Sequence, residues 1–278
     1  MKIRNLLYII GTVLIMSSCA TTSFYQVYNV KSVTEKIEKA DELVYEDNNC
    51  KISYNLWSNG GNIGFNIYNK TDKELSICLN RSNFILNGFA YDYYKNRTFT
   101  TSESKSASTT STATGAVAVT GVNIYNNIQT NQVKSSSSAN LSSSVGYAVS
   151  ITEDSIVCIP AKTTKRITEY SINNTLIRNC DLFKYPSKKE VKTKTYSIKQ
   201  SPIVFSNRIT YKIGAKYFNI ENEFFVSEIT NYPSTEFFES KYEEYCGQKS
   251  STLTRYYRYY DSDKFFMKYS KGTDYMKH

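Results

Sequence analysis

The stretch "KISYNLWSNGGNIGFNIYNKTDKELSICLN", residues 51–80, decides the fold class of this chain. Apolar and polar side chains alternate along it in three sets, Ile52/Tyr54/Leu56, Ile63/Phe65/Ile67 and Leu75/Ile77/Leu79. A period of two turns one side of a strand toward a core and the other toward solvent, as in an antiparallel sheet. The segments between the sets, 58–61 and 69–73, are rich in Gly, Asn and Asp, which favour turns. The stretch therefore predicts three half-buried strands joined by short turns.

Strand patterns continue on the C-terminal side of this stretch. "SNFILNGFAYDYY", 82–94, contains Asn87-Gly88, a strong hairpin signal. Further alternating segments lie at 155–160, 165–172, 193–214 and 217–233. So many strands predict a mainly β protein, with a single antiparallel β-sandwich over residues 31–278.

One short helix is expected near the N-terminus. "SVTEKIEKADELV", 32–44, places Val33, Ile37, Ala40 and Val44 at helical spacing behind a Ser32 cap.

A long insert interrupts the strands at 101–150, where 20 of the 50 residues are Ser or Thr. Only Glu103, Lys105 and Lys134 are charged, and large apolar side chains are few. Such a segment cannot offset the entropy lost on ordering, so we expect a flexible insert. Its centre, 113–124, does alternate small and apolar residues. The alternative is therefore a hairpin that orders on contact with a membrane or a partner.

The first residues have the layout of a secretory signal. Lys2 and Arg4 precede an apolar run, 6–16, which is too short to span a membrane, since a span needs about 20 residues. Met16-Ser17-Ser18-Cys19 resembles the lipobox of bacterial lipoproteins. That resemblance implies removal of a signal peptide, 1–18, acylation of Cys19, and a short lipidated tether, 19–30. The alternative is a soluble secreted protein with a chance cysteine.

The residues after Cys19 bear on the membrane address. Ala20 in place of Asp implies, by the same resemblance, sorting to the outer membrane. No acidic cluster follows in "CATTSFYQ", 19–26, which favours the leaflet that faces the periplasm over exposure at the cell surface.

Five further cysteines, at 50, 78, 158, 180 and 246, leave at least one unpaired thiol in an oxidising compartment. We expect Cys158 to pair with Cys180, because 157–180 reads as a strand, a turn and a second strand. No C-x-x-C motif is present, and the chain has one histidine, His278. These patterns argue against a metal site and against Ser-His-Asp or Cys-His catalysis.

Charge and composition narrow the class of partner. The formal net charge is +9, or +7 without Lys2 and Arg4. For an exported chain, this favours anionic lipids or acidic polymers over nucleic acid. Twenty-five tyrosines could stack on sugars or contact partners, although an AT-rich genome would also over-supply Tyr. In the tail, 253–272, Arg recurs among Tyr as if for stacking or cation–π contacts, or the segment forms an edge strand or a closing helix.

Several of these segments together resemble a group of uncharacterised outer-membrane lipoproteins of Bacteroidetes-type bacteria. The likeness is carried by residues 43–100, the Ser-rich insert, "CIPAKTTKRI" and "SPIVFSNRITYKIG". It implies an immunoglobulin-like β-sandwich in the cell envelope and no particular activity. Asp154-Ser155-Ile156 also resembles the O-glycosylation signal of these bacteria, which makes Ser155 a candidate glycan site.

The sequence thus supports a lipid-anchored binding or scaffold module that contacts an envelope protein or a glycan, without a cofactor. A membrane-inserting protein that acts through 101–150 is the second hypothesis. A hydrolase independent of histidine is the third. Its candidate acid pairs are Glu153/Asp154, Glu221/Glu223 and Glu243/Glu244, and a Ser-Lys dyad also stays open. No G-x-S-x-G or P-loop motif occurs.

Overall fold

The computed structural model describes residues 22–106 and 144–271. These residues form several antiparallel sheets, so the prediction of a mainly β protein is confirmed. Three 3-10 turns and one short helix complete the described elements: η1 (Leu79–Arg81), η2 (Lys188–Glu190), η3 (Ile198–Gln200) and α2 (Ser234–Phe237). None of the described helices is long and apolar enough to cross a membrane.

The largest sheet has nine strands, and its central order is β11-β6-β14-β15-β1-β18. Strands β7 and β8 extend from β14, and β13 pairs with β15. The bounds of its strands are β1 (Ser23–Ser32), β6 (Leu75–Cys78), β7 (Asn83–Leu86), β8 (Phe89–Asp92), β11 (Ile156–Ile159), β13 (Thr193–Thr195), β14 (Val204–Ile213), β15 (Lys216–Pro233) and β18 (Lys264–Ser270).

The second sheet has five strands in the order β12-β5-β4-β3-β2. Its strands are β2 (Ile37–Lys39), β3 (Leu43–Glu46), β4 (Cys50–Tyr54), β5 (Phe65–Asn69) and β12 (Thr164–Ile167). The stretch at 51–80 passes from this sheet into the larger one, because β4 and β5 belong to the five-stranded sheet and β6 to the nine-stranded sheet. Its nine alternating apolar side chains are all buried, as predicted.

One hydrophobic core lies between these two sheets and receives side chains from both. The rings of Tyr54 on β4 and Phe224 on β15 meet edge to face, with centroids 5.4 Å apart. Polar bonds cross the same core, since Asn222 Nδ2 donates to the Tyr54 hydroxyl at 2.7 Å. Asn207 on β14 donates to the Ile63 carbonyl at 3.0 Å and accepts from the Tyr93 hydroxyl at 2.6 Å. These hydrogen bonds fix how the two sheets are placed on one another, because each partner is buried and would be costly to leave unpaired.

The turn predictions are confirmed. Asn87 and Gly88, with φ of 48° and 85°, connect β7 to β8, as an Asn-Gly hairpin requires. At the 69–73 turn, Asn69 Oδ1 accepts from the backbone N–H of Thr71 at 3.0 Å. Gly60 and Gly61, with φ of 86° and 75°, lie in the turn that follows Trp57.

The helix predicted over 32–44 is wrong. Strand β1 runs to Ser32, and the segment continues as β2 and β3, with Ile37 paired opposite Tyr45. Val33 and Ala40, which the helix would have turned inward, are exposed. Leu43 and Tyr45, two residues apart, are buried instead. Pairing with neighbouring strands therefore overrides the helical spacing, because tertiary contacts outweigh a weak local preference.

The predicted tether also differs from the structure within its described part. Residues 23–30 belong to β1, which lies between β15 and β18. Phe24, Tyr25, Val27 and Tyr28 are buried, since this strand packs in the interior of the sheet. The part of the tether before residue 22 lies outside the described residues.

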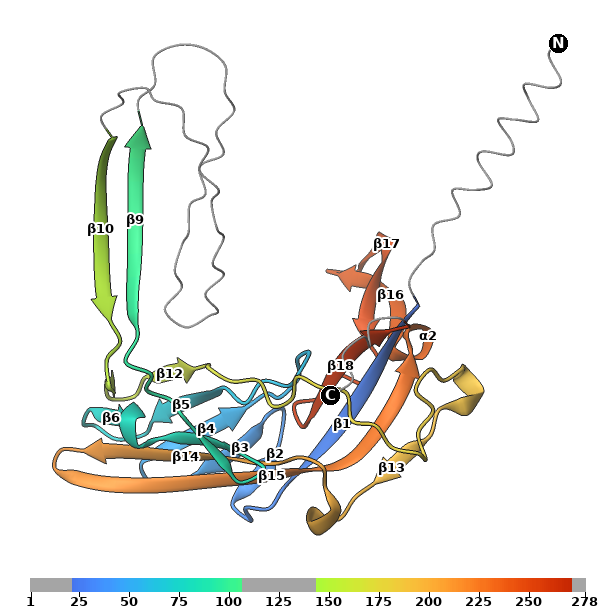
Figure 1. Cartoon of the computed structure of the whole chain (residues 1–278), viewed down its shortest axis with the longest axis horizontal. Coiled ribbons are helices and arrows are strands. Elements are labelled where there is room, and N and C mark those ends of the chain that lie inside the picture. The colour runs from blue at the N-terminus through green and yellow to red at the C-terminus, as the bar shows by residue number, and fades with distance from the viewer. Residues whose placement is uncertain (1–21, 107–143, 272–278) are drawn as a thin grey trace.

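Two pairs of strands stand apart from the large sheets (Figure 1). One is the ribbon of β9 (Thr98–Ser106) and β10 (Ser144–Thr152), in register from Thr98↔Thr152 to Ser106↔Ser144. It contains both ends of the insert predicted at 101–150, so those ends are paired strands; residues 107–143 lie outside the described residues. The other is the hairpin of β16 (Phe238–Tyr245) and β17 (Gln248–Tyr257).

The remaining strand predictions hold in part. The segments at 155–160, 193–214 and 217–233 contain β11, β13, β14 and nearly all of β15, whereas in 165–172 only residues 165–167 belong to a strand, β12. In the tail, β18 is the end strand of the main path of the large sheet, as the edge-strand interpretation required. The cation–π expectation is also met, because Arg255 lies over the ring of Phe238 at 3.6 Å.

Candidate functional site

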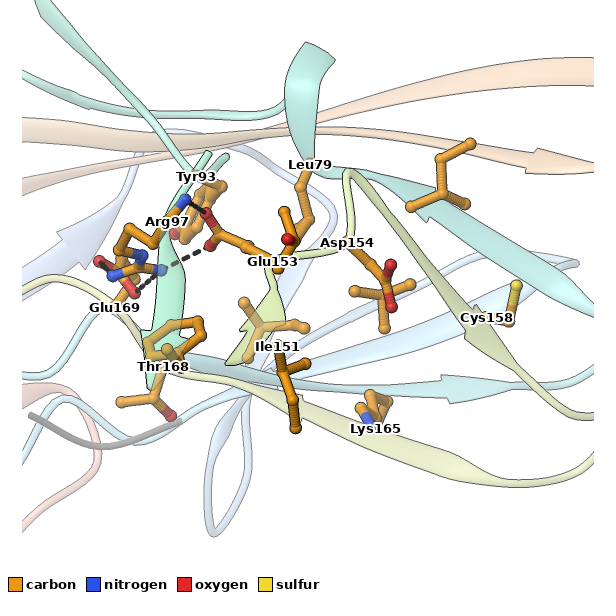
Figure 2. Close-up of a pocket in the computed structure, with 15 residues that line it drawn as sticks. Leu79, Tyr93, Arg97, Ile151, Glu153, Asp154, Cys158, Lys165, Thr168 and Glu169 are labelled. Carbon is orange, nitrogen blue, oxygen red and sulfur yellow. Dashed lines mark hydrogen bonds and ion pairs between the residues drawn. The ribbon is translucent and has the colours of Figure 1, made fainter. Parts of the chain in front are cut away.

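A cavity of about 340 Å³ lies where the β9–β10 ribbon joins the body. Figure 2 shows its walls, which come from the segment before β9, the end of β10, and strands β11 and β12. Apolar side chains form much of the lining, namely Leu79, Phe99, Ile151, Ile156, Val157 and Ile167. The cavity is therefore mainly apolar, with a charged group at one side.

That charged group is centred on Arg97, which lies between two glutamates (Figure 2). Its guanidinium contacts Glu153 Oε1 at 2.6 Å and Glu169 Oε1 at 2.8 Å. Lys95 Nζ reaches the same Glu169 oxygen at 2.8 Å and lies over the ring of Tyr170. Two cations and two carboxylates thus balance one another at the base of the ribbon.

Backbone hydrogen bonds tie Glu153 to the irregular segment that precedes β9. The N–H groups of Lys95 and Arg97 donate to Glu153 Oε2 at 3.0 and 3.2 Å, and the Glu153 N–H donates to the Arg97 carbonyl at 2.8 Å. The side chain of Glu153 is only 10% exposed. Since Glu153 directly follows β10, these bonds hold the end of β10 beside the start of β9.

The pKa values follow from this geometry. Burial acts to raise the pKa of Glu153, but hydrogen bonds from the Arg97 side chain and from the two backbone N–H groups outweigh burial and lower it. Burial likewise acts to lower the pKa of Lys95 and Arg97, and their glutamate partners raise both. Glu153, Lys95 and Arg97 are therefore held in their charged forms at neutral pH. The group can orient the ribbon and bind a polar partner.

Two candidate site residues from the sequence, Ser155 and Cys158, lie at this cavity. Ser155 is half-buried between two lining residues, Asp154 and Ile156, and its carbonyl accepts from the Leu79 N–H at 2.8 Å. Cys158 is exposed and lines the cavity. Cys19 and His278 lie outside the described residues.

The disulfide expected between Cys158 and Cys180 is not seen. Cys50, Cys78, Cys158, Cys180 and Cys246 are all free thiols in the described chain. Cys158 on β11 lies with its sulfur 3.8 Å from Ser76 Oγ, whereas Cys180 lines a separate cavity of about 260 Å³ beside Asn231. The segment between them does not form the simple two-strand hairpin we expected, because after β12 it continues without a pairing strand until β13.

The acid pairs named from the sequence are not brought together as pairs. Glu153 shares Arg97 with Glu169 rather than with its neighbour Asp154. Glu221 pairs with Arg208 at 3.0 Å, and Glu243 accepts from the Tyr256 hydroxyl at 2.7 Å. Within 22–106 and 144–271, no three His, Cys, Asp or Glu side chains gather as a metal site would need.

Sequence reasoning missed Arg97, Lys95 and Glu169, because nothing local marks them. Arg97 is 56 residues from Glu153 and 72 from Glu169 along the chain. Arg97 directly precedes β9, Glu153 directly follows β10, and Glu169 follows β12. Their contact therefore depends on the pairing of β9 with β10 and of β12 with β5.

Comparison with protein-family models, with curated proteins and with solved structures gave no match.

Proposed function

We propose that this chain is a lipid-anchored binding or scaffold module of the outer membrane, held by Cys19 on the leaflet that faces the periplasm. Residues 1–18 are its signal peptide, and its partner is an envelope protein bound along the β9–β10 ribbon. A glycan is the other partner class that the exposed tyrosines suggest. Nucleic acid, metal and cofactor have no part in the proposal.

In this proposal the body is an immunoglobulin-like β-sandwich that serves as a rigid support. Two antiparallel sheets that share one core support this interpretation. The cross-core hydrogen bonds of Asn207 and Asn222 make the support rigid.

The observation that carries the proposal is the ribbon itself. Each of its strands has nine residues, and within the described chain β9 and β10 pair only with each other. Among the described residues, both outer edges therefore present backbone N–H and C=O groups that lack a neighbouring strand. Such edges are templates for an added strand, which is a common way to bind an extended peptide.

The cavity at the ribbon base adds specificity to an edge that would otherwise accept many sequences. A strand added beside β10 would end next to Ile151, which is 53% exposed and lines the cavity. An apolar side chain of the partner could enter the cavity, while its polar groups meet Arg97 and Lys95. Main-chain bonds would then supply affinity, and the cavity would select the side chain.

The proposal is tested by chemical cross-linking in intact cells, followed by affinity purification and mass spectrometry. Wild type should capture one dominant envelope protein, and deletion of residues 101–150 should abolish the capture. A control substitution, Ile198→Ser in η3, leaves both the ribbon and the β16–β17 hairpin intact and should retain it. Equal capture by the deletion variant would refute binding at the ribbon. Retention of the deletion variant on glycan arrays would indicate a glycan ligand.

A further inference from the structure

The start of β1 fixes which end of the body lies near the proposed anchor. Only Ala20, Thr21 and Thr22 separate Cys19 from Ser23, the first residue of β1. Four steps along a fully extended chain span at most about 14 Å. If Cys19 is acylated, as the proposed function requires, the beginning of β1 cannot move farther than that from the lipid headgroups.

The β16–β17 hairpin lies at this same end of the molecule. Phe24 pairs opposite Pro233, the last residue of β15, and α2 and β16 follow at once. Tyr25 stacks on Phe237 with centroids 4.0 Å apart and meets the edge of Phe238 at 5.2 Å. Figure 1 shows the hairpin rising beside the first residues of β1, away from the two large sheets.

Large apolar side chains cover this hairpin although it is exposed along almost its whole length. Tyr245 at the tip is 83% exposed, Tyr242 and Leu253 are each 57% exposed, and Tyr260 below them is 59% exposed. A two-stranded hairpin that buries so little apolar surface is marginal by itself, and an exposed patch of this kind marks a contact surface. Tyrosine suits the membrane interface, where its ring meets acyl chains and its hydroxyl meets water and headgroups.

Lysines surround the base of the hairpin. Lys268 pairs opposite Tyr25, Lys271 lies over Tyr185, and Lys188 contacts Glu236 at 3.0 Å. Glu236 is already bound by Arg258 as well, so basic groups outnumber acidic ones at this base. The hairpin strands themselves carry three acidic and three basic residues, Glu239, Glu243, Glu244, Lys241, Lys249 and Arg255. Contact with anionic headgroups would therefore come from the base, and contact with the acyl boundary from the aromatic tip.

From these observations we propose that the β16–β17 hairpin docks on the membrane and acts as a second attachment beside the lipid on Cys19. The several acyl chains of a bacterial lipoprotein already give a lasting anchor, and a second contact would fix the orientation of the body on the membrane. The inference rests on the proposed function for the presence of the anchor. With the hairpin on the lipid surface, the body is oriented relative to the bilayer and does not swing freely on its tether.

The natural thiol at the hairpin tip provides the test. Cys246 is exposed, so full-length chain with Cys158→Ser and Cys180→Ser keeps it as the reactive thiol, because Cys50 and Cys78 are buried. The chain is purified from membranes, labelled with a polarity-sensitive fluorophore and reconstituted into phosphatidylethanolamine–phosphatidylglycerol vesicles that contain a bromolipid quencher. The control chain carries Cys180→Ser and Cys246→Ser and is labelled at Cys158, beside the ribbon cavity.

We expect the Cys246 probe to be quenched at least about twofold more than the Cys158 probe. Adding Tyr245→Ser and Leu253→Ser should bring quenching at Cys246 down to the level at Cys158. Equal quenching of the two wild-type positions in acylated, vesicle-bound protein would overturn hairpin docking while leaving the anchor in place. Mass spectrometry of the same sample reads acylation of Cys19. If acylation is absent but Cys246 is still quenched, docking stands and the anchor fails; if both are absent, both proposals fail.

Discussion

At the scale of single residues, the fold depends on a few buried polar side chains, and Asn69 is one of them. It is fully buried at the end of β5, and its Nδ2 lies 2.7 Å from the Lys73 carbonyl and 3.1 Å from the Ile159 carbonyl. Its Oδ1 accepts from the Thr71 N–H and hydroxyl. This one amide connects the turn after β5, in the smaller sheet, to the end of β11, in the larger sheet.

Asn69→Asp should therefore be costly. The substitution turns the donor into an oxygen that faces two or more carbonyl oxygens in a buried site, so we expect a loss of about 3 kcal/mol in the free energy of unfolding. Urea denaturation measures it. Asn66→Asp, a half-buried position on the same strand opposite Arg166, is the control and should change stability by less than about 0.5 kcal/mol. Equal effects of the two substitutions would show that Asn69 does not link the sheets.

Glu153 should give the molecule a defined dependence on pH. Its pKa is lowered from the ordinary 4.5 in the folded state, so the folded chain binds the proton less readily than the unfolded chain. The stabilisation is then fully present above pH 4.5 and is lost as pH falls through the folded-state pKa. Replacing Glu153 with Gln should cost about 1–2 kcal/mol at neutral pH and remove this part of the acid sensitivity.

The measurement is urea denaturation of wild type and Glu153→Gln at about pH 6 and about pH 3. The difference in stability between the two proteins should shrink at the lower pH, because protonated Glu153 no longer pairs with Arg97. A difference that stays constant or grows on acidification would contradict the contact network at the ribbon base.

At the scale of elements, turns determine which strands pair. Substitution of two turn glycines, Gly88 and Gly61, distinguishes the cost of backbone strain from the cost of a packing clash. Gly88 has φ of 85°, and a Cβ there would meet nothing within 4 Å. Gly61 has φ of 75°, and a Cβ there would lie 2.8 Å from Ile172 Cδ1 and 2.9 Å from Phe265 Cγ, both in the core. A side chain at position 88 would therefore strain the backbone only. A side chain at position 61 would strain the backbone and also clash with the core.

Gly88→Ala should consequently lower the free energy of unfolding by about 1 kcal/mol, the cost of a left-handed backbone for an L-residue. Gly61→Ala should lower it by roughly 3 kcal/mol or more, because overpacking adds to the strain. Thermal denaturation of both variants measures the contrast. A cost at Gly88 as large as that at Gly61 would mean that the β7–β8 turn is held by contacts beyond its own backbone.

The ribbon should be much less protected than the two large sheets. An isolated pair of strands is only marginally stable, whereas β14 and β15 pair over ten residues inside the large sheet. Hydrogen exchange followed by mass spectrometry should show amides of β9 and β10 exchanging at least about 100-fold faster than those of β14 and β15. Addition of the captured partner should slow exchange in the ribbon selectively. Comparable protection in the free protein would argue that the ribbon edges are already covered.

At the scale of the whole molecule, local patterns predicted the strands, and long-range pairing decided the rest. The alternation of Ile52 with Tyr54 marked a strand because both residues face one core. Leu43 and Tyr45 follow the same alternation, which indicates a strand and not a helix. The predicted helix relied on the spacing of Val33 and Ala40, and both are exposed. Polar composition over 101–150 indicated a segment without a core, but gave no sign that its two ends pair with each other.

The candidate site was beyond sequence reasoning for a similar reason. Arg97, Glu153 and Glu169 lie on three separate segments, and no spacing between them has a meaning until the strands are paired. Cysteine counting also failed to locate a bridge, since the described thiols lie on different strands and loops and all are free. Sequence therefore defines element types well and contacts between distant elements poorly.

These scales combine in one account, in which a β body with a short link to Cys19 rests its β16–β17 hairpin on the membrane and holds the β9–β10 ribbon out to a partner. Both projections leave the large sheets at separate places (Figure 1). In this account the β body carries both projections. A partner bound at the ribbon would thus be held at a set position relative to the bilayer.

The most direct test of this account is site-specific photo-crosslinking in intact cells from Ile151, the exposed residue of β10 that lines the ribbon cavity. A photoreactive phenylalanine at position 151 should give one discrete adduct with an envelope protein. The same group at Ile198, which is 39% exposed in η3, should give none. Adducts of identical pattern from both positions, or no adduct from position 151 in membranes where the chain is acylated, would contradict the claim that the ribbon is the binding surface.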